Sequence, residues 1–146
     1  NQFIWQCGKY YFEGLKSKIS ERHNQDVKLL AFISRMDAAY CAADVIISRA
    51  GALSVSELCL IGKPVILVPS PNVSEDHQTK NAMSLVNFEA AIMVKDIDCR
   101  TQLLERARNL LRDEVLSLKL SKNILSLAKP NATSDIVNES ENILLK

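Results

Sequence analysis

The sequence of 146 residues lacks the motifs of the common nucleotide-binding and metal-binding sites. It has only four glycines and contains neither GxGxxG nor GxxxxGK followed by Ser or Thr, so it carries no dinucleotide fingerprint and no P-loop. Its two histidines, His23 and His77, are far apart and have no cysteine beside them, which argues against zinc. We therefore expect no metal and no cofactor.

Long apolar runs and a large excess of one charge are also absent. No segment approaches the roughly 20 apolar residues that span a bilayer. The formal net charge of +1 argues against a surface that binds nucleic acid. With 47% hydrophobic and 24% charged residues, the composition is typical of a globular domain with a substantial core.

Cysteine is sparse as well, and no two cysteines form a CxxC pair. Scattered cysteines of this kind are typical of free, buried thiols in a reducing cytoplasm. The four positions are Cys7, Cys41, Cys59 and Cys99.

The most informative segment runs from Asp44 to Glu57. Residues 45–48 are β-branched or small and uncharged, which predicts a strand buried on both faces. Gly51 predicts a sharp turn, and a helix is expected over residues 54–61 with Gly62 as its C-cap. Because the first N–H groups of a helix lack acceptors, this order of strand, turn and helix predicts an anion site that suits a phosphate.

Glu57 has two interpretations at this stage. It lies three residues after Ser54, so the pair is compatible with a capping box in which Ser54 is the N-cap. Alternatively, the ionised carboxylate of Glu57 accepts hydrogen bonds from a ligand.

Strand-like and helical segments alternate along most of the chain, which predicts a parallel sheet flanked by helices in a Rossmann-like α/β fold. In such a sheet, ligands bind at the carboxyl ends of the strands. The strands are expected at residues 3–7, 27–32, 45–48, 65–68 and 91–94, and the helices at residues 10–21, 36–43, 54–61, 75–88 and 101–112.

Two further helices are expected near the C-terminus. The first carries Leu116, Leu120, Ile124 and Leu127 at helical spacing. The second follows Pro130 and a candidate N-cap at Asn131. Such stripes usually face a core. The apolar residues of the second helix are Ile136, Val137, Ile143 and Leu144.

Several separated motifs resemble the nucleotide-sugar half of the MurG-type bacterial N-acetylglucosaminyltransferases. They are residues 44–57, Gly62-Lys63-Pro64, residues 76–82 and the segments around Trp5 and Phe32. The resemblance implies the C-terminal half of a GT-B glycosyltransferase, truncated at its N-terminal end. It also implies one incomplete UDP-sugar-binding domain over residues 1–146, with the sheet in 1–112 and C-terminal helices in 113–146.

The resemblance assigns a role to each part of the candidate site. Phe32 and Ile33 would contact uracil, Glu57 the ribose hydroxyls, and the turn and first helical N–H groups the diphosphate. His77 and Gln78 would contact the sugar. The substrate-binding residues implied are Phe32, Ile33, Gly51, Ala52, Leu53, Ser54, Glu57, His77 and Gln78.

Several of these residues keep a second interpretation. Phe32 also fits a plain core phenylalanine, and His77 also fits a general base, since histidine titrates near neutrality. Arg49 either pairs with phosphate or forms a salt bridge that holds the loop. Asn81 is expected to cap a helix or fix a loop rather than to contact a ligand.

For the parent protein, the resemblance implies an inverting transfer of N-acetylglucosamine from UDP-N-acetylglucosamine to undecaprenyl-pyrophosphoryl-N-acetylmuramoyl-pentapeptide. Its catalytic residues and its polyprenyl-pyrophosphoryl acceptor site would lie in an N-terminal domain outside this chain, so this part alone is expected to be inactive. The protein would bind no nucleic acid and would associate peripherally with the inner face of the cell membrane. Two alternatives remain, namely a UDP-N-acetylglucosamine 2-epimerase and a non-catalytic donor-binding subunit with a membrane-bound partner.

Overall fold

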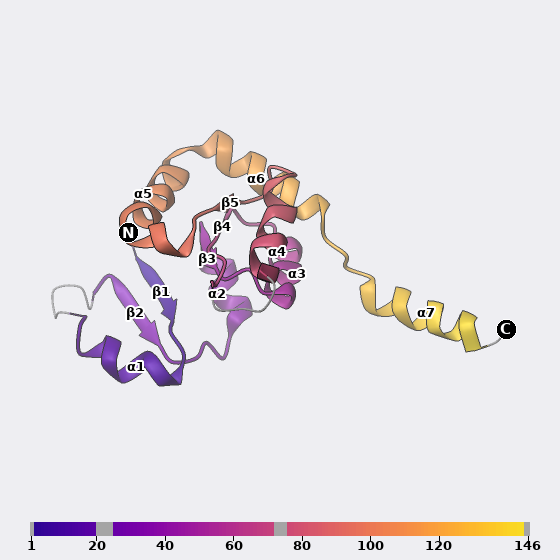
Figure 1. The fold of residues 1–146 in the computed structure, drawn as a ribbon, viewed down its shortest axis with the longest axis horizontal. Helices are drawn as coiled ribbons and strands as arrows, with labels where there is room; N and C mark the ends of the chain where they lie inside the picture. The colour runs from indigo at the N-terminus through magenta and orange to yellow at the C-terminus, as the bar shows by residue number, and fades with distance from the viewer. Residues whose placement is uncertain (1, 20–24, 72–75, 145–146) are drawn as a thin grey trace. The chain divides into compact units, whose positions relative to one another are not determined.

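The computed structural model describes residues 2–19, 25–71 and 76–144. Contacts divide the chain into two compact units, Asn1–Ala43 and Asp44–Lys146 (Figure 1). In both units the paired strands are parallel and alternate with helices, so the predicted α/β class with a parallel arrangement is confirmed. None of the helices in the described ranges has the length and apolar character needed to cross a membrane.

The first unit contains a two-stranded parallel sheet and two helices. Strand β1 (Phe3–Gln6) pairs with β2 (Val27–Leu30), and the helices are α1 (Lys9–Lys16) and α2 (Met36–Ala42). Strand β2 ends two residues before the predicted end at Phe32. Helix α1 ends at Lys16, whereas the predicted end at Glu21 lies outside the described residues.

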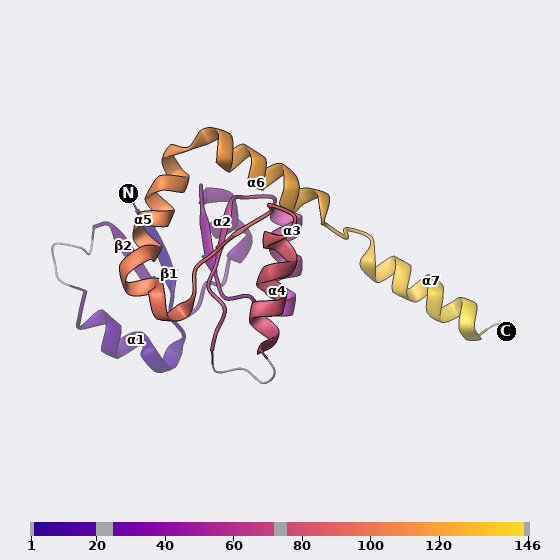
Figure 2. The same cartoon turned by 45° about the horizontal axis from the view of Figure 1, so that its top comes forward.

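The second unit contains a three-stranded parallel sheet in the order β3-β4-β5. Helices α3 and α4 lie on one side of this sheet and α5 on the other (Figures 1 and 2). The elements of the second unit are β3 (Ile46–Ser48), α3 (Ala52–Ile61), β4 (Val65–Leu67), α4 (His77–Val86), β5 (Ile92–Met93), a short 3-10 helix η3 (Asp96–Asp98), α5 (Cys99–Arg112), α6 (Glu114–Ser126) and α7 (Ala132–Leu144).

The central strand β4 explains why this sheet is stable. Its residues Val65, Ile66 and Leu67 are all fully buried, as expected for a strand covered on both faces. Side chains alternate along a strand, so Ile66 and Val68 share one face. They form a core cluster with Ala107 and Leu110 of α5 and Leu120 of α6.

The two C-terminal helices differ in burial. In α6, Leu120 and Ile124 are buried and Leu116 packs against the core, so the predicted stripe is confirmed. Asp113 caps this helix, because its carboxylate accepts a hydrogen bond from the Leu116 N–H at 2.9 Å.

For α7, the prediction of a core-facing stripe is wrong within the described structure. Ile136 and Leu144 are 66% and 84% exposed, and none of the described residues of α7 is buried. Helical periodicity shows that a helix has an apolar face, but it does not say what covers that face.

Gly62 is the C-cap of α3, as predicted. Its φ of 67° is left-handed, and its N–H donates to the Leu58 carbonyl at 3.1 Å. A Cβ atom at this position would lie 3.2 Å from Leu125 Cδ1 of α6. The backbone conformation therefore favours glycine, and a Cβ atom would also crowd the Leu125 side chain of α6.

Replacing Gly62 with alanine should lower the free energy of unfolding by about 1 to 3 kcal/mol, because the left-handed conformation and the contact with Leu125 both disfavour a side chain. Urea denaturation followed by circular dichroism measures this change. Gly14→Ala is the control, since Gly14 lies within α1 with no described atom near its Cβ position, and it should stabilise by about 0.5 to 1 kcal/mol. Equal stability of Gly62→Ala and the unmodified protein would contradict this role.

All four cysteines are free thiols, which confirms the absence of disulfides among the described residues. The prediction that all are buried is wrong for Cys41, which is exposed. Cys59 of α3 is buried, and burial raises the pKa of its thiol. The spacing of the cysteines in the sequence does not show which of them are buried, because burial depends on packing.

Candidate functional site

The carboxyl end of β3 leads directly into the N-terminus of α3, as the sequence predicts. The helix begins at Ala52 with Gly51 as its N-cap, and the Gly51 carbonyl accepts the first helical hydrogen bond from Val55 N–H at 2.9 Å. The prediction of Ser54 as N-cap is therefore wrong. The N–H groups of Ala52, Leu53 and Ser54 occupy the first turn, where a helix provides no acceptor. This end of α3 has the geometry of an anion site.

Gly51 does not have the backbone conformation that the sequence suggested. Its φ of −65° and ψ of 148° are accessible to any residue, and an added Cβ would meet only Ser54 Oγ, at an ordinary 3.6 Å, among the described atoms. The fold of this segment does not itself require glycine. The missing side chain leaves the first N–H groups of α3 open to close approach by a ligand.

Glu57 is the sixth residue of α3 and is exposed. A capping box needs its carboxylate at the third helical position, so the structure excludes that interpretation of Glu57. Ligand recognition by its carboxylate stays a prediction.

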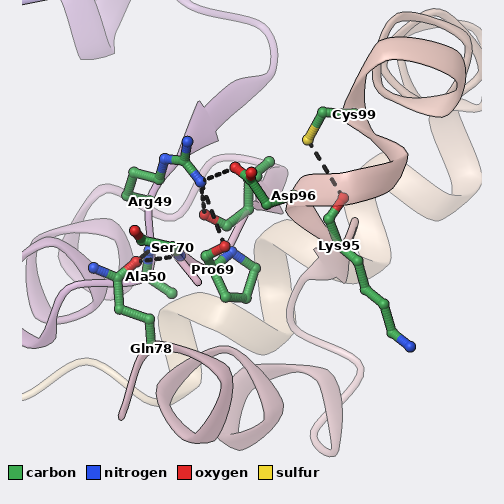
Figure 3. A network of polar contacts seen from close by, with 9 residues as sticks. Arg49, Ala50, Pro69, Ser70, Gln78, Lys95, Asp96 and Cys99 are labelled. Carbon is green, nitrogen blue, oxygen red and sulfur yellow. Dashed lines mark hydrogen bonds and ion pairs between the residues drawn. The ribbon is translucent and has the colours of Figure 1, made fainter. Parts of the chain in front are cut away.

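Gln78 of α4 connects two loops at the carboxyl edge of the sheet (Figure 3). Its Oε1 accepts hydrogen bonds from Ser70 N–H at 2.8 Å and from Ala50 N–H at 3.3 Å. Because both partners are donors, the amide orientation is determined, and the amide nitrogen points away from them (Figure 3). Gln78 therefore accepts hydrogen bonds from the protein through Oε1, and no contact of its amide nitrogen with another described residue is seen.

Asn81, one turn further along α4, binds the carbonyl of Ala50, the residue whose N–H is bound by Gln78. Its Nδ2 donates to the Ala50 carbonyl at 3.0 Å. Gln78 and Asn81 together bind both backbone groups of Ala50, which is fully buried. The prediction that Asn81 fixes a loop is confirmed.

Arg49 forms the salt bridge that was one of its two predicted roles. Its Nη1 pairs with Asp96 of η3 and also donates to the Val68 carbonyl at 3.3 Å and the Pro69 carbonyl at 3.4 Å (Figure 3). Burial is the main cause that raises the pKa of the nearby Cys99 thiol, and Asp96 adds to it.

His77 is exposed and is the first residue of α4, whose N-cap Asp76 has a left-handed φ of 55°. The predicted start of this helix at Glu75 lies outside the described residues. Neither predicted role of His77, sugar contact or general base, is decided by this position.

In the first unit, Phe32 and Ile33 follow strand β2. Phe32 is 69% exposed, so the interpretation as a plain core phenylalanine is wrong. The Ile33 N–H donates to Gln6 Oε1 at 2.8 Å, which fixes the backbone after the strand. The sequence analysis gave no role to Gln6 or Asp96, because each contacts a residue far away in the chain.

Parallel strands flanked by helices, with a helix N-terminus at the carboxyl end of β3, form an α/β domain of the doubly wound type. The chain belongs to the glycosyltransferase family 28 C-terminal domain family, whose model matches residues 1–139.

Curated relatives carry one shared name, UDP-N-acetylglucosamine--N-acetylmuramyl-(pentapeptide) pyrophosphoryl-undecaprenol N-acetylglucosamine transferase. The chain is 54% identical to the protein of Cytophaga hutchinsonii over 138 residues, 94% of this chain and 36% of the relative. It is 54% identical over 94% of its length to the protein of Flavobacterium psychrophilum, of which it covers 37%. For Parabacteroides distasonis the identity is 48% over 99% of this chain and 39% of the relative. The chain therefore spans well under half of these relatives.

Solved structures agree with this family. The crystal structure of Acinetobacter baumannii MurG superposes with a TM-score of 0.83 and 31% sequence identity, over 95% of this chain and 40% of that chain. A structure described as the glycotransferase of kitacinnamycin superposes with a TM-score of 0.67 over 94% of this chain and 34% of that chain. At 18% identity, the second comparison supports the fold alone.

Proposed function

We propose that this chain is the donor-binding part of an inverting N-acetylglucosaminyltransferase. The complete protein would transfer N-acetylglucosamine from UDP-N-acetylglucosamine to undecaprenyl-pyrophosphoryl-N-acetylmuramoyl-pentapeptide, converting lipid I to lipid II in peptidoglycan synthesis. The observation that carries the proposal is the N-terminus of α3, presented at the carboxyl edge of the sheet in a chain 54% identical to relatives named for this transfer.

The proposed roles follow from the chemistry of a UDP-sugar. The N–H groups of residues 52–54, open beside Gly51, would bind the diphosphate, aided by the helix dipole with about 0.3 to 1 kcal/mol. The Glu57 carboxylate would accept hydrogen bonds from the two ribose hydroxyls. His77 and the amide N–H groups of Gln78 would contact the sugar, and in the first unit Phe32 and Ile33 would contact uracil.

In the reaction, an acceptor hydroxyl displaces UDP directly at the anomeric carbon, and the bond to the diphosphate breaks. Negative charge then grows on the departing UDP. Fixed backbone N–H groups stabilise such charge without reorganising during the step, which is the work we assign to the start of α3. The acceptor site and the catalytic base would lie in the part of the protein outside this chain.

We further propose that residues 1–146 serve as one UDP-sugar-binding domain, with the α/β region that contains both sheets in residues 1–112 and the C-terminal helices in residues 113–146. The complete protein would act at the inner face of the cell membrane as a peripheral protein. The family match over residues 1–139 supports a single domain, and the lipid-linked acceptor in the relatives' name supports work at a membrane.

Calorimetry on the complete protein tests the donor assignment. UDP should bind at least about tenfold more tightly than ADP or GDP, because the proposed uracil contacts read one base and a site built for particular polar groups rejects others. Equal affinity for the three nucleotides would contradict the roles of Phe32 and Ile33.

A product assay tests the reaction. With UDP-N-acetylglucosamine and a polyprenyl-pyrophosphoryl acceptor, the expected product is the glycosylated lipid. Free N-acetylmannosamine would instead identify an epimerase, and activity only after a membrane-bound partner is added would identify a donor-binding subunit.

A further inference from the structure

The guanidinium group of Arg49 contacts the loops that follow β4 and β5, and Arg49 itself lies in the loop that follows β3. Arg49 lies directly after β3, its Nη1 donates to the carbonyls of Val68 and Pro69 after β4, and the same nitrogen pairs with Asp96 after β5 (Figure 3). Residues 47 positions apart in the sequence thereby meet at the carboxyl edge of the sheet.

Asp96 is the charged partner among these three contacts. The two carbonyl oxygens lie 3.3 and 3.4 Å from Nη1, near the limit of a hydrogen bond, whereas the contact with Asp96 is charge-assisted. The side chains of Arg49 and Asp96 are 55% and 37% exposed, so the ion pair adds little stability, and its expected effect is on where the guanidinium lies.

The position of Arg49 matters because the next two residues lead into α3. Ala50 is held at its N–H by Gln78 and at its carbonyl by Asn81, and Gly51 is the N-cap of α3. Arg49 thus fixes the start of residues 49–51, the segment that determines the direction of the first N–H groups of α3. A shift of about 1 Å in such a segment can cost a factor of about 100 in catalysis.

We propose that Asp96 is a positioning residue for the nucleotide-sugar donor, acting through Arg49 on the turn at Ala50 and Gly51. This inference rests on the proposed function, since it assumes that the start of α3 binds the diphosphate. Asp96 itself touches no substrate. Its carboxylate carries the same charge sign as a diphosphate, so direct contact would be repulsive.

Steady-state kinetics of the complete protein with UDP-N-acetylglucosamine test the proposal. Asp96→Ala should raise KM for the donor about tenfold, because residues 49–51 would be partly misplaced. The change in KM for the lipid acceptor should be smaller. Asp96→Asn keeps an oxygen acceptor for Nη1 but loses the charge, so its donor KM should lie between those of the unmodified protein and Asp96→Ala. The matched control is Asp98→Ala, which removes the same charge from the same 3-10 helix.

A double-mutant cycle shows whether Asp96 acts through Arg49. In an Arg49→Gln background, Asp96→Ala should change KM by less than about twofold, because the residue it positions is already gone. Full, additive effects of the two substitutions would overturn the proposal.

The remaining outcomes separate this inference from the proposed function. If Asp96→Ala lowers only the melting temperature and leaves the donor KM unchanged, Asp96 is a structural residue and the inference fails while the function stands. If the unmodified protein itself shows no use of UDP-N-acetylglucosamine, the proposed function fails first.

Discussion

Replacing Glu57 with alanine should weaken binding of UDP to the complete protein by about 10- to 150-fold. This corresponds to the 1.5 to 3 kcal/mol typical of hydrogen bonds to a charged group. The expected cause is loss of the carboxylate that accepts the two ribose hydroxyls. Because Glu57 is exposed and is not at a capping position, stability should change by no more than about 0.5 kcal/mol. Calorimetry measures the affinity, and thermal unfolding measures the stability.

Two controls make the Glu57 result specific. Glu105→Ala removes an exposed carboxylate from α5 and should leave UDP affinity unchanged. With 2′-deoxy-UDP as ligand, the unmodified protein should already lose part of its affinity, and Glu57→Ala should lose less in addition. If Glu57→Ala lowered stability without changing UDP affinity, the proposed contact of Glu57 with the ribose would be wrong.

Substitutions of Gln78 should distinguish the role of its amide oxygen from that of its amide nitrogen. Gln78→Glu keeps an oxygen for the N–H groups of Ala50 and Ser70 but removes the N–H donors proposed to face the sugar. We expect the affinity for UDP-N-acetylglucosamine to fall about tenfold relative to that for UDP. Comparing the two ligands cancels the repulsion between the new charge and the diphosphate, which they share. Discrimination against UDP-N-acetylgalactosamine should also relax.

Gln78→Ala should act differently, because it leaves two backbone N–H groups without their acceptor. It should lower the free energy of unfolding by about 1 to 3 kcal/mol and weaken UDP and UDP-N-acetylglucosamine together. If Gln78→Glu also weakened both ligands equally, Gln78 would hold the loops and would not contact the sugar. Kinetics with both donor epimers provide an independent measurement.

The order of strand, turn and helix around Gly51 was predictable from the sequence, because buried strands and helix ends leave local signals. The cap was not placed correctly, since Gly51 and Ser54 are both favoured N-cap residues and local chemistry does not choose between them. In the structure α3 begins at Ala52 with Gly51 as its N-cap, and Glu57 is therefore not at the position that a capping box requires.

The network around Ala50 was only partly predictable. Asn81 was expected to fix a loop, but its partner lies 31 residues away, and no local pattern identifies such a partner. The same limit applies to Asp96 and Arg49, which were not paired by any motif. Helix α7 shows the converse, because a clear apolar stripe predicted burial that the described structure does not provide.

Helix α4 holds residue 50 by its peptide groups, so the contact does not depend on the chemistry of the side chain at that position. Ala50 is fully buried, so a larger side chain at this position would have to displace its neighbours. The conformation of residues 49–57 therefore depends on α4 as well as on their own sequence. A graft of residues 49–57 into a related domain would orient its N–H groups only if the recipient's α4 carried an amide at each of the positions of Gln78 and Asn81.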